Sequence, residues 1–219
     1  MFTAYLRAFG QVFDPRIVRI LGVSVLLSVV VFALLWSGIA WLLTQSEVTS
    51  WWLLEKLLDV LGGVATIVTT FFVFPVVISA TIGLFLDSVA RAVEQRYYPD
   101  RKPKGLSVLA GIWASVRFLL KAVVINLVLL LFLFVPVLYP FAWLAANAYL
   151  LSREYFELVA LRHLDARAAR ELRRSRSLPL FFAGLPAAGL FAIPVVNLIA
   201  PVLTTMAMVH VFERGRRAP

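Results

Sequence analysis

Long apolar runs separated by short charged segments dominate the chain. Residues 20–43 and 63–86 are each almost wholly apolar, and each exceeds the ~20 residues that an α-helix needs to cross a bilayer. We therefore expect a transmembrane helix at 20–43 and a second at 63–98, whose charged end is a cytoplasmic extension. Between them "WWLLEKLLDVL" separates charged from apolar positions at helical spacing, which predicts an interfacial amphipathic helix at 51–61.

Two later apolar stretches are interrupted by prolines. Residues 106–152 contain "VPVLYP" and residues 178–212 contain "IPVVNLIAP", so each stretch is expected to fold back as a helical hairpin. Backbone groups freed by a proline at membrane depth must be covered by protein or water. The arms of the first hairpin are short for full spans; two tight spans and a re-entrant hairpin both fit, and we favour re-entry. The predicted fold class is an all-α integral membrane protein with two long transmembrane helices and two hemi-penetrating, proline-tipped hairpins.

Composition agrees with this pattern and excludes a soluble domain. Hydrophobic residues make up 62% of the chain and charged residues 15%. The net charge of +9 comes from basic residues that lie between the apolar segments, which argues for membrane orientation and against a nucleic-acid partner. The segment before residue 20 is basic and the connection after residue 43 is acidic, so the positive-inside rule places the N-terminus in the cytoplasm.

The chain offers little for catalysis or for a cofactor. It has no cysteine, and His163 and His210 lack further ligands at useful spacing, so we expect no metal and no cofactor. Glu154 and Glu157 lie about one helical turn apart without a nucleophile or a phosphate-binding loop, so we expect no enzyme. The apolar spans also lack the carboxylates that proton-coupled pumps use, which favours a passive mechanism.

Polar residues in the hairpins are candidates for pore lining. Asparagines are expensive against lipid, so they either bond freed carbonyls of the backbone or face a water-filled conduit. Threonines offer hydroxyl groups to an oxyanion, although in membrane helices they mostly bond their own backbone. The candidates are Asn126, Asn147, Asn197, Thr204 and Thr205.

A charged segment at 153–176 follows the first hairpin and is expected to be a basic cytoplasmic helical region. Arg153 and Glu157 can pair at i, i+4, and both ends of the hairpin are basic, with Arg117 and Lys121 at the other end. Two interpretations stay open. The segment binds the anionic lipid surface, or Arg153, Glu154 and Glu157 belong to a charged vestibule that concentrates anions.

Four stretches lie in order along nearly the whole chain: "FGQVFDPRIVRILGV", "ISATIGLFLDSVARAVE", "AYLLSREYFELVALRHLDARAARELRRSR" and "AIPVVNLIAPVLTTMAMVHVFE". In this order and spacing they resemble the successive landmarks of the CysZ family of bacterial sulfate permeases. The resemblance implies an all-helical protein of the bacterial inner membrane, with hemi-penetrating hairpins, that assembles as an oligomer and admits sulfate for cysteine biosynthesis.

The resemblance also implies an anion site at the start of the first long helix. The family has a Gly-hydrophobic-Arg-Arg run there, and the matching positions make Arg16, Ile17 and Arg19 the expected sulfate-binding residues, although arginine replaces the glycine and Val18 replaces the first arginine. Independently of the resemblance, Asp14 can cap this helix, whose N-terminus favours anions. The alternative is that Arg16 and Arg19 anchor the helix in lipid headgroups.

The sequence thus favours channel-like, passive sulfate uptake across the bacterial inner membrane. The partners expected are sulfate or a related oxyanion, membrane lipids, and further copies of the chain, because half-crossing hairpins bury little surface in a monomer. The alternative is a non-transporting scaffold or lipid-binding protein.

Overall fold

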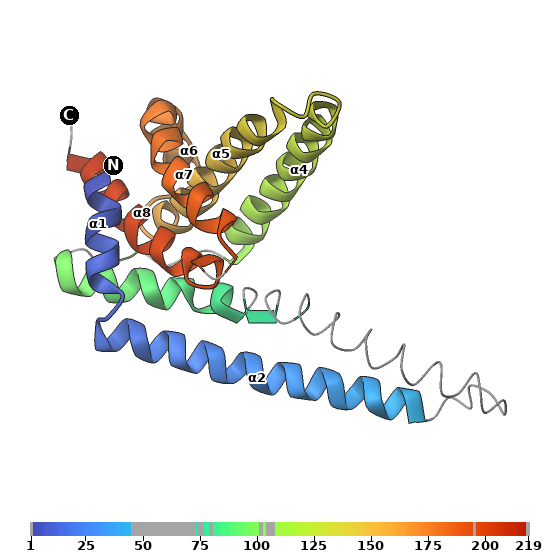
Figure 1. Cartoon of the computed structure of the whole chain (residues 1–219). Coiled ribbons are helices and arrows are strands. Elements are labelled where there is room, and N and C mark those ends of the chain that lie inside the picture. The colour runs from blue at the N-terminus through green and yellow to red at the C-terminus, as the bar shows by residue number, and fades with distance from the viewer. Residues whose placement is uncertain are drawn as a thin grey trace. The chain divides into compact units, whose positions relative to one another are not determined.

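The structure is a computed structural model that describes residues 2–44, 73, 77, 78, 81–100, 103, 108–194 and 196–217 (Figure 1). All regular secondary structure in these residues is helical, so the all-α prediction is confirmed for them. The predicted interfacial helix at 51–61 and much of the predicted helix at 63–98 lie outside the described residues. The chain divides into two compact units, one of Met1–Val18 with Leu86–Pro219 and one of Arg19–Phe85.

Helix α2, Pro15–Thr44, begins in the first unit, and from Arg19 on it makes up most of the described part of the second unit. Within it, Pro15–Gly38 is the one helix of the described chain that is long and apolar enough to cross a membrane. At 1.5 Å per residue these 24 residues extend about 36 Å, enough for a hydrocarbon core of about 30 Å. The hydroxyl groups of Ser24 and Ser28 donate to the carbonyl oxygens of Ile20 and Ser24 at 2.9 and 2.7 Å. The hydroxyl groups of both serines are therefore satisfied within the helix.

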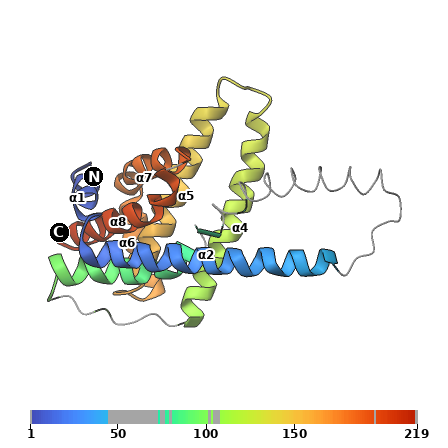
Figure 2. The same ribbon diagram turned by 60° about the horizontal axis from the view of Figure 1, so that its bottom comes forward.

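In the first unit, α4 (Val108–Phe132) and α5 (Tyr139–Ala160) run antiparallel (Figure 2). They occupy the stretch in which the first hairpin is expected. Pro136 lies in the connecting turn and Pro140 in the first turn of α5, where a proline has no helical hydrogen bond to lose. The turn exposes large apolar side chains, with Phe134 86% and Val137 78% exposed. Such a tip suits insertion into lipid, and its depth in a bilayer stays a prediction.

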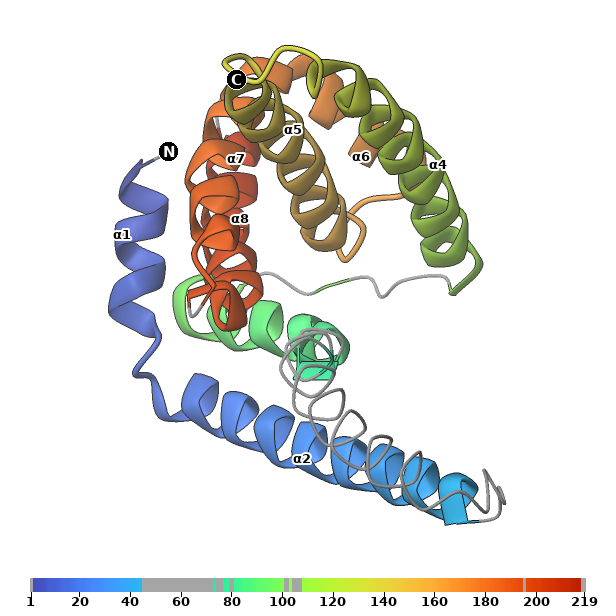
Figure 3. The same ribbon diagram turned by 45° about the vertical axis from the view of Figure 1, so that its right-hand side comes forward.

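Helices α7 (Ser177–Ala192) and α8 (Ala200–Arg217) occupy the stretch of the second expected hairpin (Figure 3). The short 3₁₀ helix η1, Val196–Leu198, lies between them, and Pro186 lies inside α7. Most side chains of α8 are buried, among them Leu203, Met206 and Phe212. Helix α8 is therefore a core helix of this unit.

The packing of α5 on α7 depends on small residues. Ala148 and Ser152 of α5 face Gly184 of α7, where a Cβ atom would overlap the carbonyl oxygen of Ala148 and lie 2.9 Å from Ser152 Cβ. Ala183 and Ala187, on either side of Gly184, are fully buried. Small residues at this spacing let two helix backbones approach closely, which fixes how α5 and α7 cross.

The first unit also contains two shorter helices and, from residue 86 on, the helix at 81–97. Helix α1, Phe2–Gln11, packs on α8, and the hydroxyl of Tyr5 donates to the carbonyl oxygen of Ala183 at 2.8 Å. Helix α6, Ala166–Ser175, begins at the N-cap residue Asp165, whose Oδ1 accepts from the backbone N–H groups of Arg167 and Ala168 at 2.9 and 2.7 Å. This cap satisfies two amides that would otherwise lack partners, and it sets where α6 starts.

Candidate functional site

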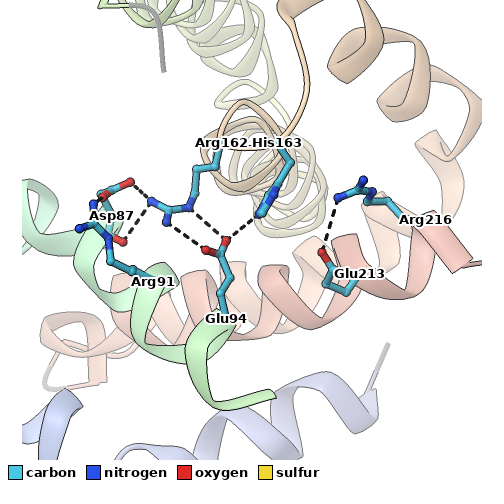
Figure 4. A network of polar contacts seen from close by, with 7 residues as sticks. All are labelled: Asp87, Arg91, Glu94, Arg162, His163, Glu213 and Arg216. Carbon is cyan, nitrogen blue, oxygen red and sulfur yellow. Dashed lines mark hydrogen bonds and ion pairs between the residues drawn. The ribbon is translucent and has the colours of Figure 1, made fainter. Parts of the chain in front are cut away.

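A buried network of charges fixes the turn between α5 and α6 (Figure 4). The carboxylate of Glu94, 3% exposed, accepts from Arg162 Nε at 3.1 Å and Nη2 at 3.0 Å and lies 2.9 Å from His163 Nε2. Arg162 also pairs with Asp87, which in turn pairs with Arg91 at 3.0 Å. Burial lowers the pKa of Arg162, yet a guanidinium stays charged at neutral pH because its ordinary pKa is so high. The bidentate pair therefore ties the helix at 81–97 to residues 162 and 163.

A second polar cluster joins α1, α8 and the end of the helix at 81–97. His210 lies with Nε2 at 2.9 Å from Gln11 Nε2 and with Nδ1 at 2.8 Å from the hydroxyl of Tyr98. With the Gln11 amide in this orientation its nitrogen donates to Nε2, and Nδ1 then carries the proton and donates to Tyr98. Both histidines are thus engaged in packing the first unit. Among the described residues no three His, Asp or Glu side chains gather as metal ligands would.

The N-terminus of α2 is occupied by the protein's own carboxylate. Asp14 Oδ1 accepts from the backbone N–H of Arg16 at 3.0 Å, which confirms the predicted cap, and Asp14 also pairs with Arg96. The amide of Arg16, and after it the Arg96 guanidinium, lower the pKa of Asp14, so this group is ionised at neutral pH. An anion at this helix end would have to compete with a negative charge already in place.

The expected sulfate residues of α2 differ in their surroundings. Arg16 is exposed and its Nη1 donates to Gln95 Oε1 at 3.4 Å, Ile17 is buried, and Arg19 is exposed. Ile17 can contribute only its backbone to a ligand, because its side chain packs in the core. The assignment of Arg16, Ile17 and Arg19 to sulfate stays a prediction.

A cavity of about 190 Å³ lies among α4, α5 and α6, and we call it the basic cavity. Six cationic side chains and one carboxylate line it, a formal excess of five positive charges. Its charged lining is Arg117, Lys121, Arg153, Glu157, Arg170, Arg173 and Arg174. A concentration of like charge on this scale attracts anions from solution.

Glu157 holds two of these cations in place. Its Oε1 lies 3.2 Å from Arg153 Nε and 3.0 Å from Arg173 Nε, so one carboxylate is shared between two guanidinium groups. The pairing of Arg153 with Glu157 predicted from their spacing is confirmed. Glu154, the third residue of the predicted vestibule, is exposed, and it is not among the residues that line the basic cavity.

The candidate pore-lining residues mostly satisfy their own helices. Asn126 and Asn147 donate from Nδ2 to the carbonyl oxygens four residues before them, at 2.8 and 2.9 Å, and the Thr205 hydroxyl does the same to Pro201 at 2.8 Å. Thr204 is fully buried, and Asn197 is half-buried in η1. Asn126 alone among them lines one of the described cavities, an open apolar groove of about 450 Å³ between α4 and α5. Their role in permeation stays a prediction.

Comparison with known proteins identifies the family. The family model described as Sulfate transporter CysZ/Etoposide-induced protein 2.4 matches residues 4–201. The chain belongs to this family. It is a family of membrane proteins that includes sulfate transporters and is not an enzyme family, in agreement with the sequence-based expectations. No curated protein that was compared with the chain matches it.

Sequence reasoning found part of this site. The basic ends of the first hairpin and the Arg153–Glu157 spacing pointed to a charged region, but the convergence of α4 and α6 on it depends on the turn held by Arg162. The link from Glu94 to Arg162 spans 68 positions of the chain, and no local pattern marks it. The local pattern that could have indicated this link is the adjacent pair Arg162 and His163, which follows an apolar helix. Charged side chains buried there need acidic partners from another part of the chain.

Proposed function

We propose that this protein admits sulfate or a related oxyanion passively across the bacterial inner membrane, where it supplies sulfur for cysteine biosynthesis. The observation that carries the proposal is membership of a membrane family that includes sulfate transporters, over residues 4–201. No single residue motif carries it.

The electrostatics of the first unit support an anionic substrate. The basic cavity holds a formal excess of five positive charges, and such a field raises the local concentration and the arrival rate of anions. The exposed apolar side chains of Phe134 and Val137 at the tip of the α4–α5 hairpin support its insertion into lipid. By the positive-inside rule the hairpin would enter from the side on which the cations lie. An anion gathered by the basic cavity would therefore be held close to the membrane, on the cytoplasmic side if the positive-inside rule holds.

Arg16, Ile17 and Arg19 remain our proposed sulfate residues at α2. A sulfate bound there would take the backbone N–H of Arg16 from Asp14 and leave that carboxylate with Arg96. Substitution of Arg19 by glutamine should weaken sulfate binding if its guanidinium contacts the anion. Arg7→Gln, an exposed arginine of α1, is the matched control. Unchanged binding in Arg19→Gln would favour headgroup anchoring instead.

The proposed conduit requires more than one copy of the chain. We propose a homo-oligomer in which Asn126, Asn147, Asn197, Thr204 and Thr205 contribute to the lining. The asparagines that bond their own backbone still offer amide oxygens to water. This arrangement predicts that crosslinks between copies will form at the α4–α5 hairpin in native membranes.

The experiment is uptake of radiolabelled sulfate by proteoliposomes that contain the purified full chain. We expect uptake above that of empty liposomes, without ATP and without an imposed proton gradient, and competition by related oxyanions. Uptake equal to that of empty liposomes, with protein shown to be inserted and oligomeric, would refute the proposal. A chain that binds anionic lipid strongly but gives no flux would be a scaffold or lipid-binding protein.

A further inference from the structure

The basic cavity lacks enough acid of its own to balance its cations. Glu157 is the one carboxylate in its lining, and it is already shared by Arg153 and Arg173. The acidic residue of α6, Glu171, is exposed and pairs with Arg167 at 3.0 Å, and neither residue lines the cavity. Lys121, Arg170 and Arg174 therefore have no carboxylate partner of their own among the described residues that line the cavity.

A buried donor in the same cavity points to a ligand. Arg153 is 5% exposed, and within the described part of the chain its Nη1 has no hydrogen-bond partner. A charged donor buried without an acceptor is costly, and in native structures such a group is nearly always matched by protein, water or a bound ion. The Nε of the same guanidinium is held by Glu157, so its plane is fixed and Nη1 cannot easily turn away.

The cationic side chains that line the cavity differ in their exposure. Lys121 and Arg174 are exposed, Arg117, Arg170 and Arg173 are half-buried, and Arg153 is buried. A volume of about 190 Å³ holds a group of a few heavy atoms with some water, but not a peptide or a nucleic-acid strand. The occupant must therefore be small, strongly anionic and rich in acceptor oxygens.

We propose that the basic cavity is a binding site for a tetrahedral oxyanion group, bound by the buried Arg153 and by Lys121 and Arg170. Guanidinium groups pair with such oxyanions through two parallel N–H donors, which the Nη atoms of arginine provide. The group is either a free sulfate or phosphate ion or the phosphate of an anionic lipid headgroup, since both present the same oxygens. The site follows from the lining charges and does not depend on the proposed transport.

The first arm of the test uses inorganic anions. Titration calorimetry of the full chain in neutral detergent, with sulfate and then phosphate, should show saturable binding that weakens as ionic strength rises. Lys121→Gln and Arg170→Gln should each weaken it by about tenfold or more, the loss expected for one charge-assisted hydrogen bond. Arg153→Gln should abolish it, and Arg170→Gln keeps the test valid if Arg153→Gln does not fold.

The second arm separates a lipid source from a free ion. Delipidated protein is returned to nanodiscs that contain either phosphatidylcholine alone or phosphatidylcholine with phosphatidylglycerol, and lipid retention is read by native mass spectrometry. If a headgroup fills the site, phosphatidylglycerol is retained selectively and the same substitutions release it, while free anions bind poorly. If a free ion fills it, the calorimetric result holds and lipid retention is unchanged by the substitutions.

Arg167→Gln is the matched control, because it removes the same charge from the same helix outside the cavity. A loss in Arg167→Gln equal to that in Arg170→Gln would overturn the proposal, since the effect would then be general electrostatics. So would the absence of binding in both arms. Binding without sulfate flux in proteoliposomes would overturn the proposed transport and leave this site standing, and flux without binding would do the reverse.

Discussion

Gly184 allows the close approach of α5 and α7, and its substitution by alanine tests that packing directly. A Cβ atom at this position would overlap the carbonyl oxygen of Ala148 and lie 2.8 Å from its carbonyl carbon. Ordinary van der Waals contact begins near 3.4 Å, so the contact with that carbon alone requires the helices to separate by about 0.6 Å. Backbone atoms cannot turn aside as a flexible side chain can, so the whole interface must open.

Gly189 supplies a control on the same helix. A Cβ atom built on Gly189 meets nothing within 4 Å. In both variants alanine replaces glycine inside α7, a change that favours the helix by roughly 1 kcal/mol. That gain cancels in the comparison, which leaves the cost of overpacking, about 1–3 kcal/mol.

Thermal unfolding in one detergent, followed by circular dichroism, measures the difference. At about 2–4 °C per kcal/mol for a chain of this size, Gly184→Ala should melt about 2–12 °C below Gly189→Ala. Gly189→Ala itself should melt at or slightly above the wild type. A melting temperature of Gly184→Ala equal to or above that of Gly189→Ala would refute the close packing of α5 on α7.

Three further predictions concern charges outside the predicted spans. Glu94→Gln should cost about 3 kcal/mol of unfolding free energy, because it leaves the buried guanidinium of Arg162 under-compensated, whereas loss of the exposed Arg91 pair in Arg91→Gln should cost less than about 1 kcal/mol. Chemical denaturation of the two variants side by side measures this. Asp165→Ala should cost about 1 kcal/mol and Asp165→Asn much less, because asparagine can still cap α6; helix content and unfolding report both. The pKa of Asp14 is lowered in the folded chain, chiefly by the amide of Arg16, so its stabilising contribution is present above the unfolded value of about 4 and is lost as pH falls through the folded pKa. Asp14→Asn should therefore lose less stability than the wild type on acidification below about pH 5, as acid titration of the melting temperature would show, and parallel curves would contradict it.

The sequence predicted those features that depend on neighbouring residues. The apolar run of α2 and the cap at Asp14 follow from local composition and spacing, and so does the i, i+4 pair of Arg153 with Glu157. Each is set within a few turns of one helix, which is the range over which periodicity carries information.

Features that join distant segments were not predictable in this way. The close approach of Gly184 to Ala148 appears only when α5 and α7 lie together, because each sequence segment alone is merely rich in small residues. The basic cavity needs α4, α5 and α6 to converge, and its cations come from positions 117 to 174. A charge pattern read along the chain showed basic ends of a hairpin, but it could not tell a lipid-facing surface from a shared cavity.

The buried network and the basic cavity are physically linked through the α5–α6 turn. Six cations in one cavity repel one another, so α6 would be pushed away from α4 and α5 unless something held its start in place. The turn before α6 is fixed by the bidentate pair of Arg162 with Glu94, and the helix start by the cap at Asp165. An anion in the basic cavity binds only where α4, α5 and α6 converge, so loosening the turn in Glu94→Gln should weaken anion binding, and sulfate or phosphate should raise the melting temperature of this variant less than that of the wild type. A ligand shift in melting temperature that is the same in both proteins would show that the turn and the cavity are energetically independent.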